Sequence, residues 1–167
     1  MGVPLIVHDP RQPERGGTVI EAPTCTEDLL TTFLGLVGLP PRDPLPGQDL
    51  SLLAAGDRDD LSRPGVLLEF VAELREGQPF YDEVWRGFRS QRFKYTVKGD
   101  KDGAQPWQLF DLYTDPYEMT NLLDDAAHRE TATRHHAWLR QQMEESIDPL
   151  ALAPAFGQPS WNLWQMA

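Results

Sequence analysis

The sequence is poor in cysteine and in basic residues, and each shortage excludes a class of protein. Of the 167 residues only Cys25 is a cysteine, so the chain forms no internal disulfide and holds no cysteine-rich zinc site. The 15 Lys and Arg residues stand against 26 Asp and Glu, which leaves a formal net charge of −11. Because this charge repels phosphate backbones and anionic headgroups, we expect neither nucleic acid nor a membrane surface as a partner.

Long apolar runs are also missing. Residues 3–7 form only a short apolar stretch without a basic leader, so the sequence shows no signal peptide and no transmembrane segment, and it does not indicate a compartment. What is present suits a globular protein, since hydrophobic residues make up 40% and charged residues 25% of the chain. The length allows one compact domain or a large piece of a bigger protein.

The first 64 residues predict a strand, a helix and a connection. The apolar run at 3–7 is typical of a strand that is covered on both faces and has neighbours in a sheet. Thr24 and Glu27 match a capping box, and apolar residues then recur at helical spacing until Gly38. Residues 40–64 are rich in Pro, Gly and Asp, which favours a surface connection with one helical turn at 50–53 and a subdomain boundary.

The second half predicts a small antiparallel sheet followed by a helix. Strands are indicated at 66–71, 84–89, 92–98 and 107–113, and the turn at 99–103 makes the last two a hairpin. Alternation places Phe93, Tyr95 and Val97 on one face of this hairpin. Asp124 is the expected N-cap of a helix that runs to about residue 146. The helix stripe expected on the sheet comprises Ala127, Thr131, His135, Trp138, Leu139, Met143 and Ile147.

The residues themselves indicate no catalytic centre and no metal site. Cys25 occupies an apolar helix position, where packing is the usual role of a free cysteine. His128, His135 and His136 share one predicted helix, but no carboxylate completes a set of metal ligands. The basic residues Arg92, Lys94 and Lys98 alternate with the apolar ones of their strand. They predict either a solvated outer sheet face paired with carboxylates or a surface for an anion or a partner.

The order of six segments carries a resemblance. They read VPLIV at 3–7, AP at 22–23, DLLTTFLGLVGLP at 28–40, PGQDL at 46–50, WRGFRSQRFKY at 85–95 and LFDLYTDPYEMTNL at 109–122. In this order they resemble the C-terminal third of sulfatases in the alkaline phosphatase superfamily. The resemblance implies an α/β or α+β fold, in which a strand and helix of the large sulfatase domain precede a small antiparallel sheet packed on a C-terminal helix.

The resemblance also implies what this chain lacks. Such sulfatases use a formylglycine made within a Cys/Ser-x-Pro-Ser-x-Arg motif, and a metal, usually calcium, held by Asp and Asn ligands. Cys25 stands in Cys-Thr-Glu-Asp and fails the motif, and the family's metal ligands and catalytic Lys and His belong upstream of the position matched by Val3. We therefore expect a C-terminal portion that is inactive alone, with calcium only in the missing catalytic part.

The resemblance divides the chain into a remnant of the catalytic domain with its connection (1–64), a small sheet subdomain (65–147) and an aromatic tail (148–167). It nominates Glu69, Arg75 and Tyr81 as peripheral substrate contacts. The expected partner is the missing catalytic segment, or a second copy bound through exposed apolar side chains of the first helix. Two alternatives stay open: a non-catalytic protein-interaction module, and the C-terminal part of a phosphonate or phosphate-ester hydrolase of the same superfamily.

Overall fold

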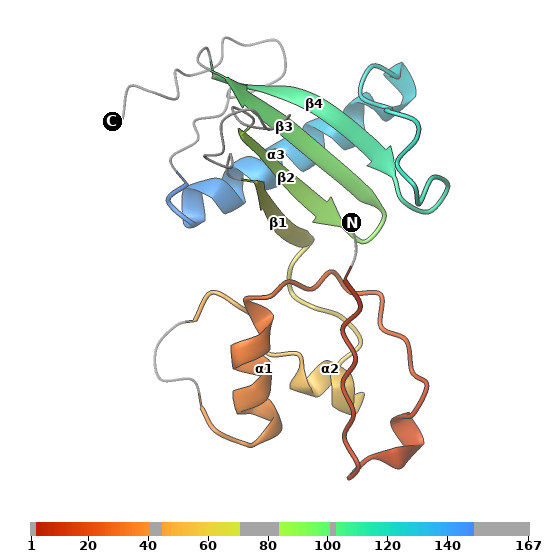
Figure 1. The fold of residues 1–167 in the computed structure, drawn as a ribbon, viewed down its shortest axis with the longest axis vertical. Coiled ribbons are helices and arrows are strands. Elements are labelled where there is room, and N and C mark those ends of the chain that lie inside the picture. The colour runs from red at the N-terminus through yellow and green to blue at the C-terminus, as the bar shows by residue number, and fades with distance from the viewer. Residues whose placement is uncertain (1–2, 41–44, 71–83, 101–102, 149–167) are drawn as a thin grey trace, which may run out of the picture. The chain divides into compact units, whose positions relative to one another are not determined.

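The computed structural model describes residues 3–40, 45–70, 84–100 and 103–148, and the chain divides into two compact units, Met1–Pro64 and Gly65–Ala167 (Figure 1). The first unit contains the helices η1 (Pro13–Arg15), α1 (Asp28–Leu36) and α2 (Ser51–Ala55). The second unit contains β1 (Gly65–Phe70), β2 (Val84–Ser90), β3 (Phe93–Asp100), β4 (Gly103–Asp111), η2 (Ala126–His128) and α3 (Arg129–Glu145). Within the described ranges, no helix combines the length and the apolar character needed to cross a membrane.

The four strands form the predicted antiparallel meander, in the order β1-β2-β3-β4. The predicted hairpin is confirmed, because β3 and β4 pair along their length and Asp100 lies opposite Gly103. A shift of register between Thr96 and Val97 marks a bulge in this pair. The small sheet and its helix therefore follow directly from the alternating sequence.

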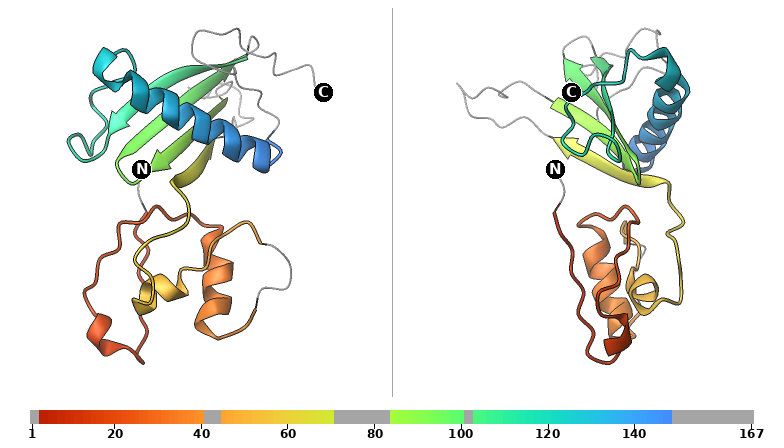
Figure 2. Two further views of the ribbon diagram at one scale, coloured as in Figure 1. Left: turned by 180° about the vertical axis from the view of Figure 1, so that it is seen from behind. Right: turned by 90° about the vertical axis from the view of Figure 1, so that its right-hand side faces the viewer.

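Helix α3 covers one face of the sheet (Figure 2). As predicted, the odd-numbered residues of β3 face this helix: Tyr95 and Val97 are fully buried and Phe93 packs against them. The core they form unites residues of β2, β3, β4 and α3. Its buried members are Phe88, Tyr95, Val97, Ala104, Leu109, Ala132, Leu139 and Met143.

The ends of α3 differ from the prediction. Asp125, not Asp124, supplies the N-terminal cap, since its carboxylate accepts a hydrogen bond of 2.9 Å from the backbone N–H of Ala127 and starts the short helix η2. Ala127 and Ile147 of the expected stripe are exposed. Both lie outside α3, so the helical period that placed them on the sheet does not extend to them.

The outer edge of β4 is covered by one side chain. The Asn121 side-chain oxygen accepts a hydrogen bond of 3.0 Å from the Leu109 backbone N–H, and its amide nitrogen donates to the Trp107 carbonyl, also at 3.0 Å. The next residue continues the pairing, because the Leu122 N–H donates to the Leu109 carbonyl at 2.8 Å. Asn121 thus satisfies edge groups that would otherwise be open to pairing with another chain.

The first unit differs most from the prediction. Residues 3–7 are not a strand and pair with no strand of the described chain, and Val3 and Ile6 remain 84% and 86% exposed. The reason is physical: a strand exists only through hydrogen bonds to a neighbour, and the four described strands all belong to the second unit. The one turn of helix expected at 50–53 is confirmed by α2.

Helix α1 begins at Asp28, four residues after the predicted cap at Thr24, and buries its polar side. Its buried residues are Asp28, Thr31 and Thr32, whereas Phe33 is 60% exposed. The unit's own apolar core is small and consists of Leu50, Leu53 and Leu61. The first unit is therefore held together largely by polar contacts.

Candidate functional site

The basic residues predicted to form an anion or partner surface are largely engaged within the chain. Arg92 makes a two-pronged contact with Asp111, with Nε 3.0 Å from Oδ1 and Nη2 2.7 Å from Oδ2. The hydrogen bonds from Arg92 lower the pKa of Asp111 to about 2, so the carboxylate is ionised at neutral pH. The Arg92 guanidinium also lies 6.0 Å from the centre of the Tyr113 ring.

Lys94 and Lys98 point to the sheet face opposite α3. Lys94 forms an ion pair with Glu118 and lies 5.2 Å from the centre of the Phe110 ring. Lys98 lies 5.2 Å from the centre of the Trp107 ring. Of the two interpretations drawn from the sequence, the described contacts favour the one in which carboxylates accompany these cations, because Arg92 and Lys94 are both neutralised.

Glu69 lies where β1 ends, directly opposite Arg86 in the register. It is half exposed, and its Oε1 is 3.5 Å from the Arg86 Nε, while the buried Asp148 carboxylate approaches the same nitrogen to 2.5 Å. Arg86 thus joins β2 to Asp148, three residues beyond the end of α3. The other two predicted substrate contacts, Arg75 and Tyr81, lie outside the described residues, so the grouping of the three stays a prediction.

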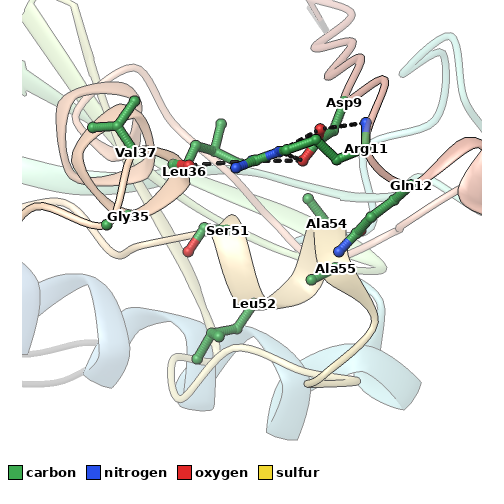
Figure 3. A pocket seen from close by; sticks show the side chains of 11 residues that line it. Asp9, Arg11, Gln12, Gly35, Leu36, Val37, Ser51, Leu52, Ala54 and Ala55 are labelled. Carbon is green, nitrogen blue, oxygen red and sulfur yellow. Dashed lines mark hydrogen bonds and ion pairs between the residues drawn. The ribbon is translucent and has the colours of Figure 1, made fainter.

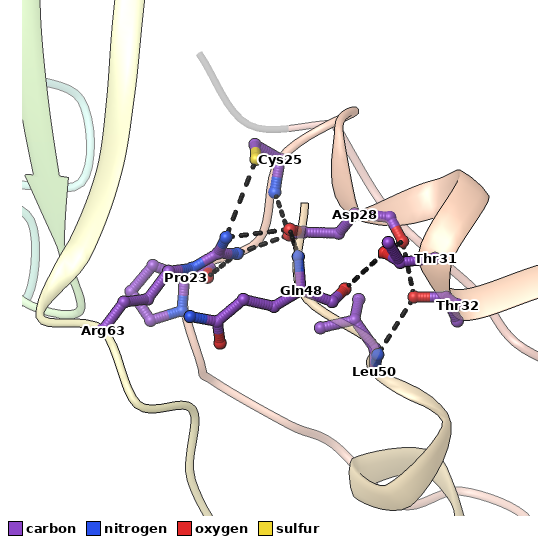
Figure 4. Close-up of polar contacts among 8 residues, drawn as sticks. All are labelled: Pro23, Cys25, Asp28, Thr31, Thr32, Gln48, Leu50 and Arg63. Atoms are coloured by element: carbon purple, nitrogen blue, oxygen red, sulfur yellow. Dashed lines mark hydrogen bonds and ion pairs between the residues drawn. The ribbon is translucent and has the colours of Figure 1, made fainter. Parts of the chain in front are cut away.

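A buried ion pair in the first unit was missed by the sequence analysis (Figure 4). Asp28 is 0% exposed and accepts hydrogen bonds from both terminal nitrogens of Arg63 and from the backbone N–H groups of Cys25 and Gln48, each of the latter at 2.9 Å. Arg63 also donates to the Pro23 carbonyl at 2.9 Å. Burial by itself would raise the pKa of Asp28, but these hydrogen bonds lower it, so the pair stays charged.

Cys25 lies beside this pair, with its Sγ 3.9 Å from Arg63 Nη1. Burial raises the pKa of the thiol, the nearby Asp28 carboxylate raises it further, and Arg63 only partly opposes them. The side chain is therefore a neutral thiol at physiological pH and lacks the thiolate that a nucleophile requires. This agrees with its predicted packing role.

A depression of about 550 Å³ lies between Asp9, the end of α1 and helix α2 (Figure 3). Its one cation, Arg11, is bound to Asp9 through two nitrogens at 2.9 and 2.7 Å, and it donates to the Leu36 carbonyl at 3.2 Å. These contacts lower the pKa of Asp9 to about 2, with the side-chain hydrogen bond from Arg11 as the main cause. Arg11 serves here to satisfy the carboxyl end of α1 and is not turned toward a ligand.

Two histidines of α3, His135 and His136, are buried. His135 donates from Nδ1 to the Thr131 carbonyl at 2.8 Å, so its Nε2, 2.9 Å from the Ser90 hydroxyl, accepts. Burial lowers the pKa of His135. The Ser90–His135 hydrogen bond resembles that between a nucleophilic serine and its general base. However, His135 is buried among Phe88, Phe93 and Trp138, so no substrate reaches it. Among the described residues, no three His, Cys, Asp or Glu side chains are grouped to hold a metal.

Comparison with known families decides the assignment. The family of N-sulphoglucosamine sulphohydrolase C-terminal domains matches residues 1–146, which include both units as far as the end of α3. The chain belongs to this sulfatase C-terminal family. The four-stranded antiparallel sheet with its helix agrees with the solved sulfatases.

Three relatives show how much of a sulfatase is covered. The "Ulvan-active sulfatase" of Formosa agariphila is 30% identical over 123 residues, which are 72% of this chain and 22% of that protein. A solved 2-O GAG sulfatase is 27% identical with a TM-score of 0.61, covering 72% of this chain and 25% of that one. The phosphonate monoester hydrolase of Agrobacterium radiobacter is 25% identical with a TM-score of 0.59, covering 83% and 28%. The chain thus spans roughly a quarter of the length of these relatives.

Proposed function

We propose that this chain acts as the C-terminal portion of a sulfuric ester hydrolase and needs a catalytic segment for turnover. The observation that carries the proposal is the match of the sulfatase C-terminal family to residues 1–146. The catalytic motif of formylglycine sulfatases does not occur in the sequence, since Cys25 is followed by Thr, Glu and Asp. The described residues contribute no nucleophile in its active form, because the Cys25 thiol is neutral and the Ser90–His135 pair is enclosed.

Calcium belongs to the same proposal. The described part of the chain does not fit a metal ion, because no cluster of three ligand side chains occurs in it. Its buried carboxylates Asp28 and Asp111 are bound to Arg63 and Arg92, and Asp28 also accepts from a backbone N–H. We therefore assign the calcium of a working enzyme to the catalytic segment. Removal of metal should accordingly leave the fold of this chain unchanged.

The first unit supports the need for a catalytic segment. Residues 3–7 have no strand partner in the described chain, and the apolar side of α1 is open to solvent. The exposed large apolar residues of this unit include Val3, Ile6, Val19, Leu30, Phe33 and Val37. Exposed apolar side chains in this number are typical of a face that packs on another segment.

A second candidate chemistry is supported by one observation. The phosphonate monoester hydrolase covers a larger share of this chain, 83%, than the solved 2-O GAG sulfatase, 72%, at similar identity. Both are hydrolases of tetrahedral oxyanion esters, and the chemistry is determined by residues outside the part that this chain matches. The proposed catalytic segment therefore decides between a sulfate and a phosphonate substrate.

The test compares this chain, a catalytic segment, and their mixture. The segment is the reading frame encoded immediately upstream, expressed separately and carrying the formylglycine motif. We expect hydrolysis of p-nitrophenyl sulfate by the mixture, abolished by a chelator, and none by this chain alone. Hydrolysis of p-nitrophenyl phenylphosphonate in place of the sulfate would favour the second candidate. Metal-dependent turnover by this chain alone would overturn the proposal.

A further inference from the structure

The Ser90 hydroxyl joins α3 to the turn between β2 and β3, and its proton has two acceptors within reach. The hydroxyl oxygen accepts a hydrogen bond of 3.0 Å from the Phe93 backbone N–H. The same oxygen lies 3.2 Å from the Phe93 carbonyl oxygen and 2.9 Å from the His135 Nε2. Because a hydroxyl carries a single proton, Ser90 donates either to the carbonyl or to the imidazole.

The other nitrogen of the imidazole determines which acceptor is used when His135 is neutral. The Thr131 carbonyl can only accept, so the His135 Nδ1, at 2.8 Å from it, carries the proton of the neutral ring. Nε2 is then an acceptor, and the Ser90 hydroxyl donates to it. The Phe93 carbonyl is left as the alternative acceptor for this hydroxyl.

A second proton on the imidazole reverses the bond between helix and sheet without breaking it. Nε2–H then donates to the Ser90 oxygen, whose two lone pairs accept from His135 and from the Phe93 N–H, while the hydroxyl proton rotates to the Phe93 carbonyl. One proton is taken up from solvent, and no bond between heavy atoms changes. The charge-assisted hydrogen bond is stronger than the neutral one that it replaces, so Ser90 offsets part of the cost of a buried imidazolium.

No charged neighbour takes over this role. The charged and titratable groups on the elements packed around His135 are Arg134 and His136 on α3, His128 on η2, Arg86 on β2, Tyr95 on β3 and Arg92 just before β3. Arg134 disfavours a proton on His135. His136 bonds to the Tyr95 hydroxyl, and the remaining three have carboxylate partners of their own. Among the described residues, no carboxylate bonds to His135, so the Ser90 oxygen is the acceptor that an imidazolium finds.

We propose that Ser90 and His135 form a proton switch, in which protonation of His135 turns the Ser90 hydroxyl from α3 to the turn between β2 and β3. In the neutral state the hydroxyl donates to the helix, and in the protonated state it closes the turn through the Phe93 carbonyl. Helix and sheet stay bonded in both states, so the second unit binds this proton while it remains folded. The switch does not depend on the proposed function.

The test follows the histidine ring nitrogens of the labelled full chain by long-range proton–nitrogen NMR from pH 7.5 to 5. We expect the neutral His135 ring to carry its proton on Nδ1, and the Phe93 carbonyl chemical shift to move with the same midpoint as the ring. S90A removes the hydroxyl and should lower the proton affinity of folded His135 about tenfold. S90T keeps a hydroxyl and should retain the wild-type midpoint. S146A removes a hydroxyl that bonds to the Met143 carbonyl and should change neither signal.

The switch is wrong if the neutral ring carries its proton on Nε2, if the Phe93 carbonyl shift does not follow the titration, or if S90A titrates like the wild type. It is also wrong if His135 gains its proton only as the second unit unfolds, which a simultaneous loss of the dispersed amide signals would show. Should S90A not fold, the ring tautomer and the Phe93 shift decide the question, because both are measured on the wild-type chain.

Discussion

Arg63 stabilises the first unit through a contact with a residue 35 positions away in the sequence. Its guanidinium neutralises Asp28, which in turn accepts hydrogen bonds from Cys25 and Gln48, so one carboxylate holds the start of α1, the segment before it and the segment before α2. The Thr31 hydroxyl donates a hydrogen bond to the Gln48 carbonyl, and the Thr32 hydroxyl accepts one from the Leu50 N–H. This network replaces the apolar core that the unit largely lacks.

We predict that R63M lowers the free energy of unfolding by about 3–5 kcal/mol, because it leaves the Asp28 carboxylate buried without its cation. Urea denaturation followed by circular dichroism measures the loss. R58M is the matched control, since Arg58 is exposed, and should behave as the wild type. An unchanged midpoint for R63M would show that backbone N–H groups alone are sufficient for Asp28.

His135 gives the second unit a predicted dependence on pH. Its pKa is lowered by burial, so the unfolded chain binds a proton at a higher pH than the folded chain does. The full stability is present above the unfolded value of about 6.5 and is lost as the pH falls from there through the folded pKa. Urea midpoints measured from pH 7.5 to 5 should therefore decline, and H135Q should flatten the decline. H8Q, at an exposed position, should retain the wild-type slope, and a slope that H135Q does not alter would contradict this account.

At the scale of elements, the edge strand β4 depends on the segment that follows it. Asn121 satisfies the Leu109 N–H and the Trp107 carbonyl on the side of β4 that no strand of the described sheet covers. An open edge of this kind invites pairing with another chain. The side chain of Asn121 therefore has a role both in stability and in preventing aggregation.

We expect N121A to lower the free energy of unfolding by about 1–2 kcal/mol, as two hydrogen bonds to the strand edge are lost. The variant should also aggregate faster on heating, which static light scattering would detect. D124A, three residues away and exposed, provides a control that should match the wild type. Equal stability and equal aggregation of N121A would mean that water satisfies the edge equally well.

In helix α1, the spacing of apolar residues did not predict which side of the helix is buried. Its spacing predicted an apolar side that stays partly exposed, and Phe33 is 60% exposed, but the spacing did not predict that Asp28, Thr31 and Thr32 form the buried side. Periodicity identifies two faces of a helix but does not decide which face the available partner covers. In the second unit the partner is within the chain, and the orientations of Phe93, Tyr95 and Val97 were predicted correctly.

The ionic contacts could not be predicted in the same way. Asp28 and Arg63 lie far apart in sequence, and nothing in their local pattern marks either of them as buried. The basic cluster was identified from its composition, but the carboxylates that neutralise Arg92 and Lys94 come from segments after β3.

At the scale of the whole molecule, the exposed side of α1 predicts self-association of the isolated chain. Leu30, Phe33 and Val37 lie on this side and are each more than half exposed. Sedimentation velocity should therefore show oligomers whose fraction grows with concentration, and the double variant L30S/F33S should shift the chain toward monomer. Y117S removes an even more exposed aromatic residue from the second unit and should leave the distribution unchanged. A monodisperse wild-type monomer at high concentration would contradict this prediction.

The two units together agree with the proposal that this chain is one part of a larger hydrolase. The family match extends over both units, and the described residues provide a fold and a polar network but no group of three His, Cys, Asp or Glu side chains that could hold a metal. The division into a remnant of the catalytic domain and a small sheet subdomain remains a prediction. It agrees with a first unit that lacks strand partners and a second unit with its own core.

The most direct test of this account is turnover of p-nitrophenyl sulfate by the chain mixed with its separately expressed upstream segment. The account predicts metal-dependent hydrolysis by the mixture and none by this chain alone. It is contradicted if this chain hydrolyses the ester by itself, or if a folded upstream segment that carries formylglycine reaches the same rate without it.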